Sequence, residues 1–115
     1  MGPLSEPADP DGVAVLAVQF APGARTDWHS HPAGQVLFGV SGTGVVVDET
    51  GDAALIGSGD TVTAPPGRLH WHGSMGHSPM MHLSITSGGP TEWSGDKVSD
   101  AQYAEGIATA GDAAT

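Results

Sequence analysis

Short runs of alternating apolar and polar residues recur along this chain, and each run has the length of a β-strand. The first clear run extends from Val13 to Phe20. Side chains two apart in a strand point to the same side, so Leu16, Val18 and Phe20 share one face. We expect this face to line the interior, with Leu16 and Val18 facing a cavity.

A late run, Met80 to Thr86, alternates as cleanly. One of its faces is polar and carries His82, Ser84 and Thr86, while the other face is apolar throughout. Polar side chains are unusual as plain filling of a β-structure. If this face points inward, it fits a binding or reaction chamber.

Between these runs the pattern predicts further short strands separated by glycine-rich turns. Gln35 to Val40 and Gly44 to Asp48 read as one hairpin, and Ala53 to Ile56 with Asp60 to Ala64 as a second. Leu69 to Gly73 reads as a single strand. The sequence therefore predicts an all-β domain.

The two ends of the chain differ from this middle. Residues 1–12 are acidic and proline-rich and are expected to form a flexible arm, followed by one domain over 13–104. Ser99 and Gln102 have capping-box spacing and predict a short helix that Gly106 breaks. Residues 105–115 are poor in large apolar side chains and are expected to be disordered.

Composition narrows the class of protein. The chain has 115 residues, enough for one domain, with 18 glycines, 9 prolines and no cysteine, which excludes disulfide and thiolate chemistry. The formal charge of −10 disfavours binding to nucleic acid or to an anionic membrane. No apolar run reaches the ~20 residues of a bilayer span, and no secretory signal is recognisable. A cytoplasmic location is expected.

Four side chains have the chemistry and spacing of metal ligands. His29 and His31 are two apart, so a strand turns both imidazoles to one side. The turn Pro32-Ala33-Gly34 then brings the Gln35 amide oxygen back toward them. His70 follows a Pro-Pro-Gly turn and supplies a fourth donor.

These residues resemble the paired signatures of the cupin superfamily. Gly23, His29, His31, Gln35 and Gly42 match the first signature, with glutamine where glutamate is usual. Gly59, Pro65, Gly67 and His70 match the second signature. Ser74 stands at the position where this signature usually has asparagine. The resemblance implies a single-domain cupin (jelly-roll) β-barrel, here with a short C-terminal helix. It leaves enzymes, sensors and storage proteins open.

Three imidazoles and one amide oxygen leave about two positions open on an octahedral ion, where a substrate or water can bind. Because Gln35 is neutral, the ion keeps more of its charge and is a stronger Lewis acid. That favours polarising an oxygen over activating dioxygen. This donor set fits one divalent transition metal, namely Mn²⁺, Fe²⁺, Co²⁺, Ni²⁺ or Zn²⁺.

His82 is the candidate general base, because an imidazole titrates near the pH at which a base must operate. The alternative is a core histidine satisfied by a hydroxyl. His72 is read first as structural, and otherwise as a supporting group or alternative ligand. Thr26 and Thr86 are placed at the mouth and floor of a substrate pocket, although Thr26 suits turn stabilisation equally.

Four segments, FAPGARTDWHSHPAGQ, PPGRLHWHG, MHLSI and EWSGDKVSDAQY, resemble small bacterial manganese-dependent hydroxynitrile lyases. The resemblance implies a Mn²⁺ ion held by His29, His31, Gln35 and His70, with His82 as base. It further implies reversible cleavage of a cyanohydrin to a carbonyl compound and HCN. The alternatives are a metal-dependent cupin dioxygenase and a non-catalytic module that binds a small molecule or metal.

The outward positions of two predicted strands are apolar. These positions are more than one thin barrel can bury: Met81, Leu83 and Ile85 on one strand, and Val36, Phe38 and Val40 on the other. We therefore expect a homodimer that covers this sheet.

Overall fold

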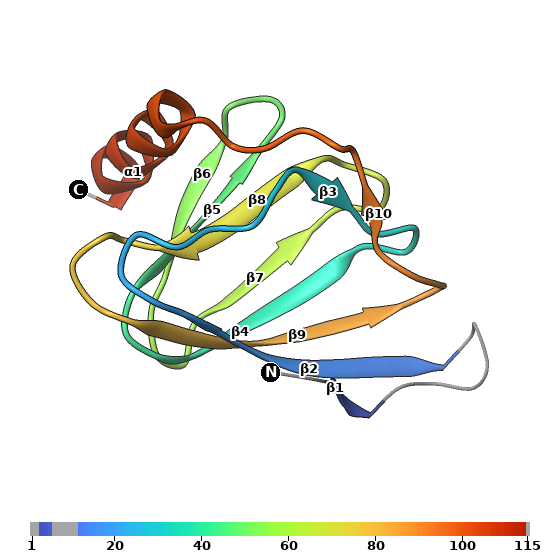
Figure 1. The fold of residues 1–115 in the computed structure, drawn as a ribbon. Coiled ribbons are helices and arrows are strands. Elements are labelled where there is room, and N and C mark those ends of the chain that lie inside the picture. Colours follow the sequence, from blue (N-terminus) through green and yellow to red (C-terminus); the bar gives the residue numbers. More distant parts are fainter. Residues whose placement is uncertain (1–2, 6–11, 115) are drawn as a thin grey trace.

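The computed structural model describes residues 3–5 and 12–114. In these ranges the chain forms short strands followed by a single helix (Figure 1). The elements are β1 (Pro3–Ser5), β2 (Val13–Phe20), β3 (His29–Ser30), β4 (Gln35–Ser41), β5 (Gly44–Asp48), β6 (Ala53–Ile56), β7 (Thr61–Ala64), β8 (His70–Ser74), β9 (Met80–Ser87), β10 (Glu92–Trp93) and α1 (Asp100–Ala114).

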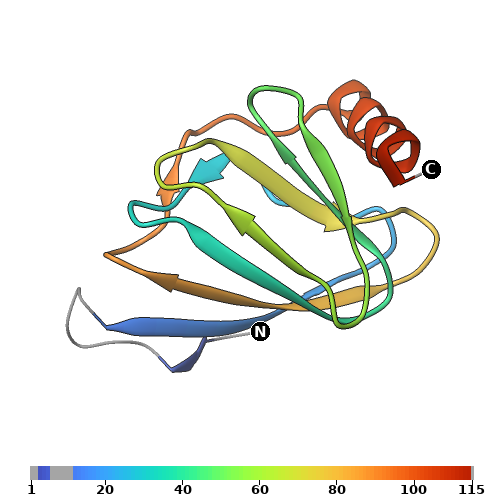
Figure 2. The same ribbon diagram turned by 180° about the vertical axis from the view of Figure 1, so that it is seen from behind.

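The strands form two five-stranded sheets that face each other, which Figure 2 shows from behind. Sheet 1 has the order β1-β2-β9-β4-β7, and sheet 2 has the order β10-β3-β8-β5-β6. All strand pairs are antiparallel. This confirms the predicted jelly-roll fold, with the difference that the two sheets do not close into a barrel.

The two predicted hairpins are wrong. β4 pairs with β7 and β9, whereas β5 pairs with β6 and β8, so the chain changes sheet between β4 and β5 and again between β6 and β7. Alternation in a sequence reports which face of a strand is buried, but not which strand lies beside it. Leu37 of β4 and Val46 of β5 therefore meet across the sandwich instead of along one sheet.

The core between the sheets confirms the inward face predicted for β2. Val18 and Phe20 are buried there, and Leu16 packs against them. The cluster also contains residues from both sheets: Leu37, Val46, Ile56 and Met80. This apolar group fills one half of the interior and leaves the other half to the polar side chains described below.

Helix α1 covers the outer face of sheet 2. Its start confirms the capping box: the Ser99 backbone N–H donates to Gln102 Oε1 (2.9 Å), and the Gln102 N–H donates to Ser99 Oγ (3.1 Å). Gly106 does not break the helix, which continues to Ala114. It lies against Trp71, where an added Cβ would come within 2.7 Å of the indole. The glycine is therefore a contact point for the sheet.

The disordered tail expected over residues 105–115 is a helix as far as Ala114, and residue 115 lies outside the described residues. Ala110 is only 1% exposed, because the small side chain lets the helix approach the sheet closely. At the other end, Pro3–Ser5 pair with β2, so this part of the expected arm is a strand. The rest of that arm, except Gly12, lies outside the described residues.

The helix of the described chain is too short and too polar to cross a lipid bilayer.

Candidate metal centre

The polar half of the interior is built from both sheets. β3 carries His29, and His31 follows it directly. β8 carries His70 and His72, and the Cα of His70 lies opposite that of His29 in the ladder. The alternation of β8 turns both of its histidines inward and Trp71 outward.

Sheet 1 supplies the facing side chains. Gln35 begins β4 after the predicted turn, in which Gly34 has φ +84°. Its Cα is paired with that of Thr86 on β9, and His82 lies further along the same strand, opposite Gly39. The carbonyl of His31 holds the two motif loops together, since it accepts from the backbone N–H groups of Gly34 (3.1 Å) and Gly67 (2.9 Å).

All these side chains are buried. His29, His31, Gln35 and His70 are between 1% and 4% exposed, as are His72 and His82. The structure thus brings together the four side chains that the sequence predicted as metal ligands. It also brings in His72, which the sequence analysis had read first as structural.

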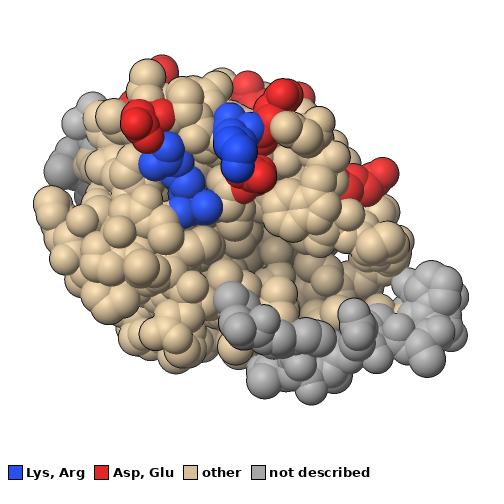
Figure 3. All heavy atoms as spheres, in the orientation of Figure 1, with Lys and Arg blue, Asp and Glu red and all other residues tan. Residues whose placement is uncertain are grey.

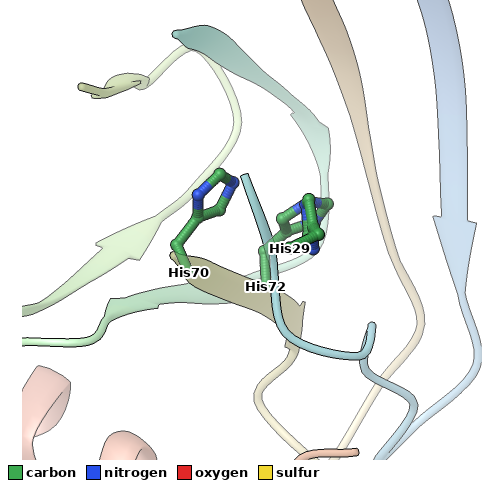
Figure 4. A group of neighbouring side chains, drawn as sticks. All are labelled: His29, His70 and His72. Atoms are coloured by element: carbon green, nitrogen blue, oxygen red, sulfur yellow. The ribbon is translucent and has the colours of Figure 1, made fainter. Parts of the chain in front are cut away.

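The imidazoles form a compact cluster. The ring centroid of His29 lies 4.4 Å from that of His70, 5.2 Å from that of His31 and 5.1 Å from that of His72. Figure 4 shows His70 and His72 on β8 with His29 beside them. Each of these three histidines has one ring nitrogen that lies within 4.8 Å of a ring nitrogen of the other two, so the three side chains could hold a metal ion. His31 completes the cluster, with its centroid 5.6 Å from that of His70.

Backbone carbonyls set the tautomers of two imidazoles. His29 Nδ1 lies 2.8 Å from the Asp27 carbonyl oxygen, and His70 Nδ1 lies 3.1 Å from that of Arg68. A carbonyl only accepts, so each Nδ1 carries the hydrogen and each Nε2 keeps a lone pair. Such support from a carbonyl is what metal-bound histidines ordinarily have at the second ring nitrogen.

His70 Nε2 lies 2.9 Å from Gln35 Oε1. In the tautomer set by the Arg68 carbonyl, both atoms are acceptors, and two acceptors this close repel unless a cation lies near both. His31 Nε2 is also buried and has no hydrogen-bond partner. These unsatisfied lone pairs fit a metal ion bound by His29, His31, Gln35 and His70.

Burial keeps the imidazoles neutral. Desolvation lowers the pKa of His29 to about 4 and that of His31 to about 4, and it is also the main cause that lowers the pKa of His70. Neutral rings offer lone pairs to a metal at pH 7. The site therefore needs no deprotonation before it binds a cation at this pH.

His72 and His82 form a second unit. His82 Nε2 lies 3.0 Å from His72 Nδ1, while His72 Nε2 and His82 Nδ1 are buried and have no partner. Desolvation lowers the pKa of His82 and lowers that of His72 well below its ordinary value. In one neutral tautomer pair His82 Nδ1 has the free lone pair, and in the other His72 Nε2 has it.

The side-chain amide of Gln35 has a contact at each end. Its Nε2 donates to Ser84 Oγ over 2.5 Å, and its Oε1 faces His70 as described above. Ser84 is 6% exposed and lies on the inward face of β9, two residues from His82. The sequence placed Ser84 on this face but gave it no partner.

The residues expected to line a substrate pocket lie in different places. Leu16 and Val18 belong to the apolar half of the interior. Thr26 Oγ1 lies 3.5 Å from His29 Nδ1 and accepts from the His72 backbone N–H at 3.3 Å. Thr86 is half-buried and lines a surface pocket of about 200 Å³ that also contains Gln35.

Trp93 was missed by the sequence analysis. Its ring centroid lies 4.9 Å from that of His29, and the side chain is 61% exposed, so it borders the cluster on the solvent side. The strand that carries it, β10, has only two residues, so no alternation could reveal it. His72 did carry a signal, its i+2 spacing from His70.

A jelly-roll sandwich that holds neutral nitrogen and oxygen donors between its sheets defines a metal-binding class of small β-proteins. The chain belongs to the cupin family, since the profile of the cupin domain matches residues 16–86. It is 42% identical over 104 residues to an (R)-mandelonitrile lyase of Granulicella tundricola, and the match covers 88% of this chain and 79% of that protein.

Solved structures agree with this assignment. A cupin-like protein of Thermotoga maritima superposes with a TM-score of 0.79 at 36% identity, covering 84% of this chain and 74% of that one. The DMSP lyase DddQ of Ruegeria pomeroyi superposes with a TM-score of 0.65 at 25% identity, over 73% of this chain and 44% of that one.

Proposed function

We propose that this cupin is a metal-dependent lyase of the hydroxynitrile lyase type, which cleaves a cyanohydrin reversibly to a carbonyl compound and HCN. The observation that carries the proposal is the buried His72–His82 pair beside the proposed ligand set, with 3.0 Å between His82 Nε2 and His72 Nδ1. The similarity to an (R)-mandelonitrile lyase over 88% of the chain supports the choice of reaction.

His29, His31, Gln35 and His70 would hold the ion, and Mn²⁺ is our first choice because of the family resemblance. When bound, a divalent ion in this set of neutral donors supplies Lewis-acid polarisation of an oxygen. His72 Nε2, like His31 Nε2, has no hydrogen-bond partner. We prefer the set with His31 because, when His82 Nε2–H donates to His72 Nδ1, neutral His72 carries its hydrogen on Nε2 and has no lone pair for the ion there.

His82 would act as the base. With Nε2–H donating to His72 Nδ1, the lone pair on His82 Nδ1 is free to take the hydroxyl proton of the cyanohydrin. The O–H electron pair then forms the carbonyl bond, and the C–C bond breaks with its pair leaving as cyanide. The proton held by His82 goes to cyanide, which leaves as HCN.

Mandelonitrile cleavage by the full-length protein tests this proposal, with benzaldehyde release followed by absorbance. We expect cleavage with Mn²⁺ added and its loss after chelation. His82→Ala should lower kcat by about 10²–10⁴-fold while Mn²⁺ affinity stays near that of the wild type. His77→Ala is the matched control, because this histidine is exposed in a loop outside the cluster.

Equal rates for the wild type and His82→Ala would remove the assigned base. Uptake of dioxygen with a phenolic or diketone substrate, in the absence of mandelonitrile cleavage, would instead favour the dioxygenase alternative. Metal binding without either activity would favour a binding module.

We also propose that the protein forms a homodimer through the outer face of sheet 1. Phe38 and Val40 are 38% and 39% exposed there. None of the outward positions of β2, β9, β4 and β7 is charged, although the chain has 13 acidic residues. Figure 3 shows charged side chains on the upper part of this view, over the sheet 2 side. A second copy is the fitting occupant because two such faces meet without bringing acids together.

A further inference from the structure

We propose that Trp93 is a specificity-determining residue that binds the aryl group of a neutral aromatic substrate beside the metal centre. This inference rests on the proposed function and deepens it, because it names the class of substrate that the same site prefers. Its basis is the position of the indole: the ring centroid lies 4.9 Å from that of His29, while the side chain is 61% exposed.

The ladder places the indole on the inner face of sheet 2. Trp93 of β10 is paired with His29 of β3, and directly paired side chains of an antiparallel ladder lie on the same face. His29 is 2% exposed and belongs to the interior, so the indole lies on the interior face at the edge of the sheet (Figure 1). An exposed side chain on an inner face marks a place where the interior opens to solvent. A molecule that enters there contacts the indole next to His29.

The backbone around Trp93 is fixed to the segment that carries His29. The Ser94 N–H donates to the Trp28 carbonyl oxygen, and the Trp28 N–H donates to the Asp96 carbonyl oxygen, both over 3.1 Å. The indole is therefore held on a paired backbone although most of its surface is exposed. A ring held in this way loses little conformational freedom when a ligand binds to it.

The exposed indole surface suits a flat apolar ligand. Aromatic rings pair in offset or edge-to-face arrangements, and a ligand ring on Trp93 also covers apolar surface that is now in water. The other two tryptophans of the chain have different surroundings. Trp71 is buried in the cluster beneath α1, and Trp28 packs against the same cluster. Trp93 is thus the tryptophan that presents its ring to a molecule at the histidines.

The charges near this position favour a neutral ligand. Glu92 and Asp96 lie within three residues of Trp93, and Asp27 lies two residues before the histidine that the indole contacts, whereas Lys97 is the neighbouring cation in the chain. The balance is negative, so a carboxylate on the ligand would be repelled. An aromatic cyanohydrin has the required ring and no charge.

The kinetic test compares two cyanohydrins on the full-length protein with Mn²⁺ added: mandelonitrile, which has a phenyl ring, and acetone cyanohydrin, which has none. Trp93→Leu should lower kcat/KM for mandelonitrile about 2- to 12-fold, the factor that corresponds to the ~0.5–1.5 kcal/mol of an aromatic pair. The loss should lie in KM, because the contact is the same in the ground state and the transition state. The kcat/KM for acetone cyanohydrin should stay at the wild-type value. Trp93→Phe is the matched variant, since it keeps an aromatic face and should retain most of the preference.

A second readout does not depend on activity. The indole N–H signals of isotope-labelled protein are followed by NMR while benzyl alcohol is added, both to the metal-free protein and to protein with Zn²⁺, which has a filled d shell. The Trp93 signal, assigned by its absence in Trp93→Phe, should shift and reach saturation. Isopropanol has the hydroxyl without the ring and should leave this signal in place. The signals of Trp28 and Trp71 are internal controls that should not shift.

The outcomes separate the two proposals. Equal losses for both cyanohydrins in Trp93→Leu, together with weaker Mn²⁺ binding, would overturn the inference and make Trp93 a support of His29. A wild-type KM for mandelonitrile in Trp93→Leu would also overturn it, as would a Trp93 signal that benzyl alcohol leaves unchanged in both forms of the protein. A saturable shift of this signal without mandelonitrile cleavage would overturn the reaction and support the aromatic site. Thermal unfolding checks that each variant folds.

Discussion

The two sheets differ on both of their faces. On the inside, sheet 2 and the residue after β3 bring the imidazoles His29, His31, His70 and His72, whereas sheet 1 brings Gln35, His82 and Ser84. If the proposed roles hold, sheet 2 and the residue after β3 supply three of the four metal ligands, and sheet 1 supplies the fourth ligand and the base. Substitutions in one sheet should then separate metal binding from catalysis.

On the outside, sheet 2 is covered and sheet 1 is open. Helix α1 packs on Trp71, Val45 and Val47, which are at most 7% exposed. No element of the described chain covers Phe38 and Val40 in the same way. The covered face explains how a short chain builds a second apolar cluster, and the open face is where we expect the second copy.

The largest effect is expected from His70→Ala in sheet 2. Loss of a proposed ligand should lower Mn²⁺ affinity by more than about 100-fold, because even outer partners contribute 10- to 100-fold. His82→Ala in sheet 1 should leave the affinity near the wild-type value. Metal content of the purified proteins and calorimetric titration measure both, and similar losses in the two variants would erase the contrast between the sheets.

Phe38→Lys on the open face of sheet 1 should weaken the proposed dimer by about 30-fold, or ~2 kcal/mol, since it places a charge at the centre of an apolar contact. Sedimentation velocity at several concentrations measures the change. Thr109→Lys adds the same charge on the exposed side of α1 and serves as control. A wild-type protein that sediments as a monomer at micromolar concentration would contradict the dimer.

Gly106→Ala tests the covered face of sheet 2. The added Cβ would lie 2.7 Å from Trp71 Cζ2 and 2.8 Å from Val47 Cγ2, so we expect the free energy of unfolding to fall by about 1–3 kcal/mol. Gly111→Ala is the matched control in the same helix, because a Cβ there meets nothing within 4 Å. It should be neutral or stabilising by up to about 1 kcal/mol. Urea unfolding compares them, and equal stabilities would mean that α1 is not tightly docked.

The metal-free protein should also lose stability as the pH falls. Burial lowers the pKa of His29 and of His31 to about 4, so the unfolded chain binds more protons than the folded one below about pH 6.5. The free energy of unfolding should have its full value above pH 6.5 and should fall as the pH drops toward 4. The pKa of Asp48 is lowered from 3.8, so its titration changes the free energy of unfolding only below this pH range. Equal urea midpoints at pH 7 and pH 5 would contradict the prediction.

Much of the fold could be predicted from local pattern. Alternation located β2 and β9 and their inward faces, because burial on one side of a strand leaves a period of two in the sequence. The pairing of one strand with another leaves no such periodic pattern in the sequence. β4 and β5 are adjacent in the chain and yet lie in different sheets, because a jelly roll buries both of their inner faces only when the chain crosses over.

The site shows the same division. His29, His31, Gln35 and His70 were predicted from spacing and converge as expected, although their role as ligands stays a prediction. The contact between His82 and His72 joins strands of opposite sheets, and the one between Gln35 and Ser84 depends on the ladder register. Neither has a fixed separation along the chain. Gly106 misled the helix prediction because its role is set by Trp71, 35 positions earlier in the numbering.

The histidine tautomers at the centre are set by carbonyl oxygens and owe nothing to the side chains at positions 27 and 68. Every amino acid has a carbonyl, so replacement of Asp27 or Arg68 leaves the hydrogens on His29 and His70 where they are. The loops that border the centre can therefore diverge in sequence, and be redesigned toward other substrates, without disturbing which nitrogens face the interior.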